Sequence, residues 1–452
     1  MSSHLFQPPA GTRDFYPAEF SRRRYIVEAW RAAAVRHGFD EIDGPTFEHL
    51  DVYTAKSGPE IVSQLFSFRR AGGEKDYALR PEFTPTLARM FAEHAGSLSK
   101  PTKWFWTQNC FRAEKNQRGR LREFWQWNCD ILGDASPGAD AEVIGVSVGL
   151  LRDLGLRPEH VRVKLSDRVV VGRILESAGV RAEKVGEAFE LLDLRGKVSR
   201  EHLVKEAGAL GLDLNAFDSV SVAIARAFAE RRHDDLLGLA GANDLGSLGG
   251  LAQDALYRLR DLARELDAAG LIEWCDLELS VVRGLAYYTG TVFEVHEVSG
   301  KERAIAGGGR YDKLVETFGG PATPAVGFGM GDVVLSLVLG DRGLMPDDKA
   351  MAGRLGLRPD VFVISNGTPE ADAALPRVVT KLRTAGLHAR RSYKGTKNIG
   401  KLLKEASEAM GGSRYAAIIE GAAEVTLKNL ETGAQERVPM EGLEKRVVAA
   451  VG

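Results

Sequence analysis

The chain has 452 residues, with 60 lysines and arginines against 62 aspartates and glutamates, so its formal net charge is −2. A hydrophobic content of 44% and a charged content of 27% exclude a largely disordered chain and allow a sizeable core. At roughly 150 residues per domain, the length predicts about three domains. Because the charge is nearly balanced, a nucleic-acid partner would need a local basic surface.

The cysteines are Cys110, Cys129 and Cys275, and none of them has CxxC spacing. This argues against a disulfide framework and against a structural zinc, and we expect no protein-bound metal. Residues 1–14 lack the apolar core of a signal peptide. No apolar run approaches the ~18 residues of a membrane span. We therefore expect a soluble, cytoplasmic protein without membrane contact.

The first hundred residues predict two helices and two short strands. Apolar residues recur at helical spacing between 26 and 34, and Gly38 is typical of a helix end. Residues 39–45 then predict a strand, and residues 77–79 predict another. Proline disfavours helix in the residue before it, so the second helix is expected to begin at Thr86, after the prolines at 81 and 85.

Residues 102–112 and 121–132 predict two strands joined by a polar loop. Side chains alternate between the two faces of a strand, so the second strand has an apolar face formed by Trp125, Trp127, Cys129 and Ile131. The opposite face carries Arg122, Phe124, Gln126, Asn128 and Asp130. An arginine, an aromatic ring, an amide and a carboxylate on one face are typical of a binding surface.

The middle of the chain predicts a helical insertion, because the pattern is mostly helical from residue 168 to about 268. Around it we expect a helix at 141–154, strands at 161–165, 276–282 and 291–296, a glycine cluster at 307–309 and a last helix at about 330–339. A linker-like segment, residues 341–357, follows. Beyond it strands and helices alternate, which predicts a small α/β domain.

Four residues in and beside the loop at 113–120 have the chemistry of a nucleotide site. Arg112 and Arg120 offer planar guanidinium groups to phosphate oxygens. Phe124 offers a flat face on which a base can stack, and Glu114 lies in the loop between them. A surface hairpin with scattered salt bridges would contain the same residue types, and by residue type alone the two interpretations are equally good.

Three further segments are weak signals when taken singly. Glu82 and Thr84 can hold an ammonium group, although turn and helix-capping chemistry suits them better. Residues 281–290 and 306–312 place an arginine or a glycine cluster where the backbone can approach a ligand. Taken alone, a packed turn explains the first better than a binding site does, and the second does not fit the spacing of a P-loop.

Taken together and in this order, the segments resemble the class II aminoacyl-tRNA synthetases and, within them, the histidyl-tRNA synthetase family. The resemblance rests on Leu79-Arg80-Pro81-Glu82-Phe83-Thr84, Phe111-Arg112-Ala113-Glu114, Gly119-Arg120-Leu121-Arg122-Glu123-Phe124-Trp125-Gln126, Arg283-Gly284-Leu285-Ala286-Tyr287-Tyr288-Thr289-Gly290 and Gly308-Gly309-Arg310-Tyr311-Asp312. It covers essentially the whole chain.

The resemblance implies an α+β fold, with an antiparallel sheet flanked by helices and a C-terminal α/β anticodon-binding domain. The expected division is a catalytic domain in two parts (1–167 and 271–340), a helical insertion (168–270), a linker (341–357) and the anticodon-binding domain (358–452). The resemblance also implies that L-histidine is activated with ATP to histidyl-adenylate and then transferred to tRNA(His). ATP is expected as a substrate with Mg²⁺, no tightly bound cofactor is expected, and a homodimer is expected to form through the first helix–strand segment.

Family roles are carried over position by position. Glu82, Thr84 and Gln126 would hold the α-ammonium group, while Asp130 and Tyr288 would bind the imidazole nitrogens. Arg112 and Arg283 would be catalytic and would stabilise the charge that develops on the α-phosphate. The full expected histidine set is Glu82, Phe83, Thr84, Arg112, Gln126, Asp130, Arg283, Tyr287 and Tyr288. The full ATP set is Arg112, Glu114, Arg120, Phe124, Gly309 and Arg310.

Three positions depart from the family pattern. Asp130 stands where many members have glutamate, and Ala286 stands where an aspartate is usual. Val334 stands where the last helix generally carries an arginine that packs over the adenine or the outer phosphates.

The missing arginine opens an alternative function, that of a synthetase-like paralogue that regulates or senses, such as the regulatory subunit of ATP phosphoribosyltransferase. That subunit normally lacks the C-terminal domain, whereas this chain keeps it together with Arg112 and Arg283, so we favour the active enzyme. A basic run near the C-terminus fits a tRNA contact and a solvated face equally well; it consists of Arg390, Arg391, Lys394, Lys397 and Lys401.

Overall fold

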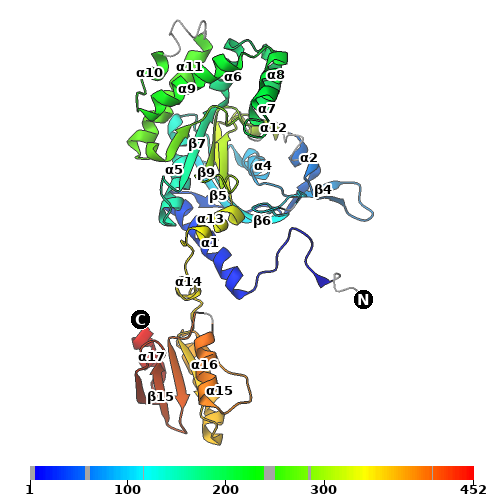
Figure 1. The fold of residues 1–452 in the computed structure, drawn as a ribbon. Helices are drawn as coiled ribbons and strands as arrows, with labels where there is room; N and C mark the ends of the chain where they lie inside the picture. Colours follow the sequence, from blue (N-terminus) through cyan, green and yellow to red (C-terminus); the bar gives the residue numbers. More distant parts are fainter. Residues whose placement is uncertain are drawn as a thin grey trace. The chain divides into compact units, whose positions relative to one another are not determined.

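The computed structural model describes residues 6–55, 62–115, 117–238, 250–282, 287–409 and 411–451. Contacts divide the chain into two compact units: Met1–Arg13 with Val27–Leu344, and Asp14–Ile26 with Met345–Gly452. Figure 1 shows the elements of both units. Among the described residues, no helix is both long enough and apolar enough to cross a membrane.

The larger unit is built on an eight-stranded sheet, with the strand order β1-β5-β6-β11-β10-β9-β7-β8. The strands are β1 (Asp40–Glu41), β5 (Thr102–Phe111), β6 (Glu123–Leu132), β7 (Val161–Asp167), β8 (Cys275–Leu277), β9 (Thr291–Glu297), β10 (Ala306–Arg310) and β11 (Ala325–Gly331). The six inner strands pair antiparallel, as expected. Each edge strand, β1 and β8, pairs parallel with its neighbour, so the sheet is mixed.

Helices cover both faces of this sheet. On one face, Phe83, at the start of helix α4 (Thr84–His94), stacks on Trp106 of β5, with ring centroids 4.3 Å apart. On the other face, Trp30 of helix α1 (Pro17–Arg36) stacks on Trp127 of β6 at 6.1 Å. The remaining covering helices are α5 (Pro137–Asp153), α12 (Leu314–Thr317) and α13 (Asp332–Asp341).

Two smaller parts complete this unit. A three-stranded sheet contains β2 (Phe47–His49), β4 (Asp76–Leu79) and β3 (Ser67–Arg69), with helix α2 (Leu50–Thr54) beside it. Between β7 and β8 the described residues are mostly helical, as the pattern in the sequence predicts. This segment contains α6 (Arg168–Ser177), η2 (Ala182–Lys184), α7 (Val185–Asp193), α8 (Arg200–Leu210), α9 (Leu214–Ala229), α10 (Asp235–Gly238), α11 (Gly250–Ala268) and η4 (Ile272–Trp274).

The C-terminal unit is an α/β sheet with apolar clusters on both faces. Its strand order is β13-β12-β14-β15-β16. Val361 and Val363 of β12 belong to one buried cluster, and Phe362 and Ile364 belong to the other, because successive side chains of a strand point to opposite faces. The elements are α14 (Asp348–Arg354), β12 (Val361–Ser365), α15 (Pro369–Thr384), β13 (Ala389–Arg391), α16 (Ile399–Glu408), β14 (Tyr415–Ile419), β15 (Glu424–Asn429), β16 (Gln435–Pro439) and α17 (Leu443–Val451).

Several element boundaries differ from the sequence-based predictions. Helix α4 begins at Thr84 and not at Thr86, because proline is well tolerated in a first helical turn, where its missing N–H would have no partner. The glycine cluster lies inside strand β10, and the last helix begins at Asp332 because β11 continues to Gly331. The strands expected at 39–45 and 276–282 are shorter, and the expected linker contains helix α14.

Candidate active site

One face of the central sheet is lined by glycines where β10 and β11 meet. In the register, Gly307 pairs with Gly329 and Gly309 pairs with Gly327, and paired residues of antiparallel strands share a face. Gly331 lies on the same face, two residues beyond Gly329. We call Gly307, Gly309, Gly327, Gly329 and Gly331 the glycine face. The polar residues of β6 lie beside it, since Gln126 pairs with Gly331, Asn128 with Gly329 and Asp130 with Gly327.

Part of the glycine face is open space. A Cβ atom added at Gly331 would meet no atom within 4 Å, and one at Gly307 would meet only a carbonyl oxygen at 3.9 Å. By contrast, a Cβ at Gly308, on the opposite face, would lie 2.6 Å from the Gly327 carbonyl oxygen and from the Phe328 side chain. The glycines therefore leave room for a ligand on one face and allow tight packing on the other.

Asp130 is a buried carboxylate with one satisfied oxygen. Its side chain is 1% exposed, and its Oδ1 accepts a hydrogen bond of 2.6 Å from the Tyr311 hydroxyl. Among the described residues, Oδ2 has no hydrogen-bond partner. Burial raises the pKa of Asp130 to about 7, and the nearby Glu82 carboxylate also raises it, while the Tyr311 hydrogen bond lowers it. A buried acceptor without a partner is costly, so Oδ2 suits a donor supplied by a ligand.

Glu82 repeats this arrangement. It is buried, and its Oε2 accepts a hydrogen bond of 2.7 Å from the Tyr287 hydroxyl. Within the described part of the chain, Oε1 lacks a partner. Burial raises the pKa of Glu82, while Tyr287 and the positive charge of Arg112 lower it. Two buried carboxylates, each with one unsatisfied oxygen, suit a ligand with two N–H donor groups.

Two other residues expected to bind histidine, Thr84 and Gln126, are linked through Asn128. Gln126 Nε2 lies 2.7 Å from Asn128 Oδ1, and Asn128 Nδ2 lies 3.5 Å from Thr84 Oγ1, so the three residues form a short polar row. Burial raises the pKa of Tyr288, and the charges of the nearby Glu82 and Asp130 raise it further. The Phe83 ring, in contrast, is fully buried against Trp106, which argues against the direct side-chain contact expected of Phe83.

The hairpin formed by β5 and β6 brings the expected nucleotide residues together. The Arg112 guanidinium lies 5.2 Å from the centroid of the Phe124 ring, and its Nε donates to the Pro81 carbonyl oxygen at 2.9 Å. Arg120 forms an ion pair with the buried Glu114. These contacts place two guanidinium groups and an aromatic ring at the end of the hairpin, next to the polar row of β6.

The structure does not support the ATP contacts expected of Arg310 and Gly309. The Arg310 side chain is 1% exposed, and its Nη2 donates to Asp140 at 2.6 Å and to the Ser136 carbonyl oxygen at 3.0 Å. Its Nη1 donates to the Asp134 carbonyl oxygen at 2.9 Å. This guanidinium thus holds the sheet to the start of helix α5. Gly309 pairs with Gly327, and Gly327 pairs with Asp130, so Gly309 lies level with Asp130 across the sheet. Phe124 lies near the other end of β6.

Two positions singled out in the sequence, Arg283 and Ala286, lie outside the described residues. Val334 is described: it is buried in the first turn of α13, and a Cβ added at Gly119 would lie 3.4 Å from its Cγ2. At the start of the same helix, Asp332 accepts hydrogen bonds from the Trp125 amide at 2.9 Å and from Arg13 at 3.0 Å. The Val334 side chain therefore lies beside the hairpin loop at Gly119.

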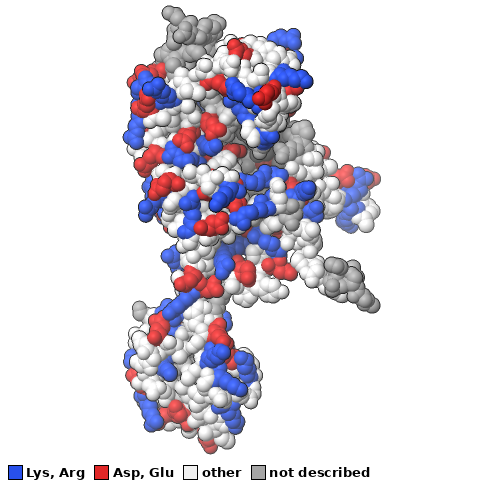
Figure 2. Space-filling model, in the orientation of Figure 1, with Lys and Arg blue, Asp and Glu red and all other residues white. Residues whose placement is uncertain are grey.

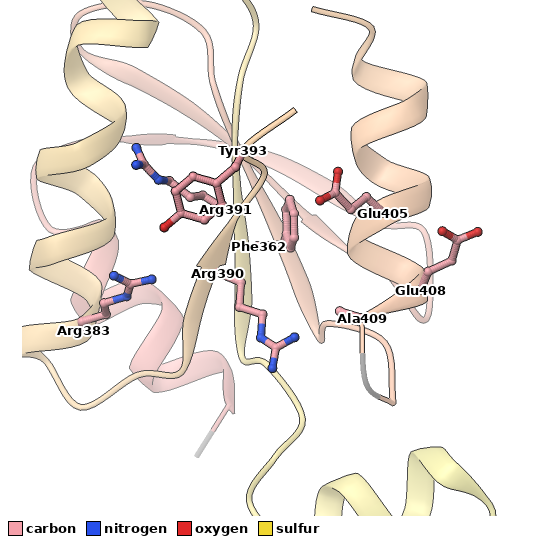
Figure 3. Close-up of a pocket in the computed structure, with 8 residues that line it drawn as sticks. All are labelled: Phe362, Arg383, Arg390, Arg391, Tyr393, Glu405, Glu408 and Ala409. Atoms are coloured by element: carbon pink, nitrogen blue, oxygen red, sulfur yellow. The ribbon is translucent and has the colours of Figure 1, made fainter. Parts of the chain in front are cut away.

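The C-terminal unit contains a second candidate, a groove beside the edge strand β13 (Figure 3). Arg391 lies 4.5 Å from the centroid of the Tyr393 ring, and Tyr393 is strongly exposed. Helix α16 contributes Glu405 and Glu408, so the lining is of mixed charge. The lining residues are Phe362, Arg383, Arg390, Arg391, Tyr393, Glu405, Glu408 and Ala409. Figure 2 likewise shows positive and negative side chains interspersed on the visible surface.

Sequence reasoning missed the partner of Asp130 and most of the glycine face. Tyr311 was part of a segment noted for its glycines, and no role was expected of it. The period-two glycines Gly327, Gly329 and Gly331 are visible in the sequence. Glycine on every second residue of a strand is a signal for a face without side chains, and it could have located the glycine face.

Comparison with known proteins agrees with this geometry. The family model described as histidyl-tRNA synthetase matches residues 11–331. The histidine–tRNA ligase of Opitutus terrae is 38% identical over 448 residues, covering 98% of both chains. Crystallised histidyl-tRNA synthetase from Nostoc sp. PCC 7120 shares the fold, with a TM-score of 0.77, 23% identity and 99% of both chains covered.

A structure from Bacillus halodurans C, described as an ATP phosphoribosyltransferase regulatory subunit/histidyl-tRNA synthetase, shares the fold with a TM-score of 0.70 and 21% identity. It covers 89% of this chain and 97% of its own. At that identity it is evidence for the fold alone. The family-model match and the identity to the ligase over nearly the full length together show that the chain belongs to the histidyl-tRNA synthetase family.

Proposed function

We propose that this protein activates L-histidine with ATP and transfers it to tRNA(His). The observation that supports this most strongly is the pair of buried carboxylates, Glu82 and Asp130, each with one unsatisfied oxygen among the described residues. They lie beside a sheet face without side chains and near a hairpin that carries Arg112 and Phe124. This arrangement suits a small cation-bearing ligand next to a nucleotide.

The two carboxylates would divide the polar groups of histidine between them. Glu82, with Thr84 and Gln126, would hold the α-ammonium group. Asp130 would accept the imidazole N–H through Oδ2, and Tyr288 would contact the other ring nitrogen. Because Tyr311 already occupies Asp130 Oδ1, its hydroxyl would fix the direction in which Oδ2 points. A side chain without ring nitrogens would leave these buried groups unpaired, so it would be rejected.

ATP would enter with Mg²⁺ as part of the substrate. Phe124 would stack on the adenine, and Glu114 and Arg120 would bind near the adenine and the outer phosphates. The ribose would lie over the open glycine face, at Gly307 and Gly331. Arg112 would bind the α-phosphate from one side, and Arg283 would bind it from the other.

The reaction would proceed in two steps, formation of the adenylate and transfer to the tRNA. A carboxylate oxygen of histidine attacks the α-phosphorus, the bond to the bridging oxygen breaks, and pyrophosphate leaves. The 3′-terminal adenosine of the tRNA then attacks the carbonyl carbon through a hydroxyl group, and AMP leaves. In the first step Arg112 and Arg283 would act mainly by orientation and charge stabilisation, with no covalent role.

The C-terminal unit would contact the tRNA through the groove beside β13. Tyr393 would offer a ring for an unpaired base, and Arg390 and Arg391 would contact phosphates. The anticodon-binding role of residues 358–452 and the division into catalytic, insertion and linker segments belong to this proposal. So do assembly as a homodimer through the first helix–strand segment and a cytoplasmic location.

No observation on the described residues favours the regulatory alternative. A histidine-dependent exchange of pyrophosphate into ATP separates the two functions. Exchange supports the synthetase, and histidine binding without exchange by well-folded protein would support the regulator.

A further inference from the structure

The hairpin loop is attached to two elements that are distant in the sequence. The Arg118 Nε donates to Oε1 of Glu302 at 2.6 Å, and Nη2 lies 3.1 Å from Oδ2 of Asp341. Glu302 belongs to the turn between β9 and β10, and Asp341 is the last residue of α13. One arginine thus connects the loop to the turn before β10 and to the end of α13.

The two ion pairs differ in strength because their carboxylates differ in burial. The Glu302 side chain is 4% exposed, whereas the Asp341 side chain is 59% exposed. Exposed pairs contribute little, but removing the partner of a buried charge leaves an uncompensated charge and is strongly unfavourable. The bond between Arg118 and Glu302 should therefore decide whether the loop stays in place.

The same loop packs on α13 at the position of the missing arginine. Gly119 adopts a left-handed backbone (φ 74°), and a Cβ there would lie 3.4 Å from Val334 Cγ2. Val334 and Asp341 are seven residues apart, so they share one face of the helix. The loop follows that face, and an arginine at position 334 would compete with it for space.

The loop geometry connects this attachment to ATP. The amide of Arg120 donates to the Gln117 carbonyl oxygen at 2.9 Å, which closes a tight turn around Arg118 and Gly119. Arg120 forms its ion pair with Glu114 directly beyond this turn. Fixing Arg118 and Gly119 therefore fixes the residue that is expected to meet the outer phosphates.

We propose that the ion pair between Arg118 and the buried Glu302 is a latch, which holds the loop on Val334 and so positions Arg120 and Glu114 for ATP. This inference rests on the proposed binding of ATP at the hairpin. Arg118 and Glu302 are positioning residues in this account. The latch takes the place that the family arginine would occupy, so the departure at Val334 is part of how this chain builds its ATP site.

The first test measures the loop without any substrate. Glu302→Gln changes neither the loop sequence nor a proposed ATP contact, and it should make trypsin cleavage after the loop residues Lys115, Arg118 and Arg120 several-fold faster. Glu48→Gln is the matched control, because Glu48 is also buried and also pairs with an arginine, Arg89, but neither residue belongs to the turn that carries Glu302. Cleavage at the wild-type rate in the Glu302 variant, or equal acceleration in both variants, would overturn the latch whatever the activity of the chain.

The second test measures ATP use by pyrophosphate exchange. Arg118→Ala and Glu302→Gln should each raise the KM for ATP roughly tenfold, the loss expected for a hydrogen bond between charged groups. The KM for histidine should change little, and the double variant should be no worse than Arg118→Ala alone.

The effect of Val334→Arg on the KM for ATP depends on whether position 334 supports the loop or merely lacks a positive charge. The latch predicts a higher KM for ATP, because the longer side chain displaces the loop. A lower KM would show that a positive charge is simply missing there, and it would overturn the proposal. Absence of exchange in the wild-type chain would refute the proposed function, while the proteolysis test of the latch would still stand.

Discussion

Replacing Asp130 by asparagine tests two properties of this buried carboxylate: its contact with histidine and its effect on the stability of the ligand-free protein. Asparagine has nearly the same shape, and its Oδ1 can still accept the hydrogen bond from Tyr311. The side-chain amide, however, presents donors where the carboxylate presents an acceptor. We therefore expect Asp130→Asn to raise the KM for histidine about tenfold or more, the loss of one hydrogen bond to a charged group.

Without ligand, the stability of the Asp130→Asn variant relative to the wild type should increase as the pH rises. Burial raises the pKa of Asp130 from its ordinary value of 3.8 to about 7. A raised pKa in the folded state means that the wild type loses stability between those two values as the pH increases, whereas the variant does not. Between pH 5 and pH 8 the linkage relation gives a relative gain for the variant of about 2–3 kcal/mol.

Thermal unfolding of both proteins between pH 5 and pH 8 measures this difference. The midpoint of the variant should rise relative to the wild type by several degrees across that range. A difference that stays constant with pH would show that Asp130 has an ordinary pKa. An unchanged KM for histidine would show that Asp130 does not face the substrate.

Five further substitutions test other parts of the site. Glu82→Gln should raise the KM for histidine about tenfold and the KM for ATP much less; equal effects would contradict its assignment to the ammonium group. Gly307→Ala should keep the thermal stability but impair ATP use, whereas Gly308→Ala should lower the unfolding midpoint, because only the second Cβ meets backbone atoms at 2.6 Å; the reverse pattern would place the ligand elsewhere. Arg283→Ala should lower kcat far more than it raises the KM for histidine, and a near-normal kcat would refute its electrostatic role. Tyr393→Ala should raise the KM for tRNA in aminoacylation by about 5–50-fold, the loss of one stacked base, and an unchanged KM would exclude the groove beside β13.

The polar face of strand β6 could be predicted because side-chain alternation is a local property of the sequence. Gln126 and Asp130 fall on one face by counting residues. The alternating glycines of β11 can be found by the same counting, but their position beside Gln126 and Asp130 could not be predicted, since it depends on the register between β6 and β11, which are about 200 residues apart in the chain. That register is what brings Gly327 next to Asp130.

Arg310 shows what a role carried over from a family resemblance leaves out. The resemblance implies a contact with ATP, but the partner that holds this guanidinium is Asp140, 170 residues away in the sequence. Tyr311 was missed for the same reason, because its contact with Asp130 spans 181 residues. Local chemistry indicated the kind of site, and long-range pairing decided which side chains face it.

Pyrophosphate exchange into ATP, measured with each of the twenty amino acids in turn, tests the central claim most directly. We predict exchange with histidine alone, because its α-ammonium group and its ring N–H match the oxygens of Glu82 and Asp130 that lack partners among the described residues, and its second ring nitrogen matches Tyr288. Exchange with a different amino acid, or no exchange with any of them from folded protein, would contradict it.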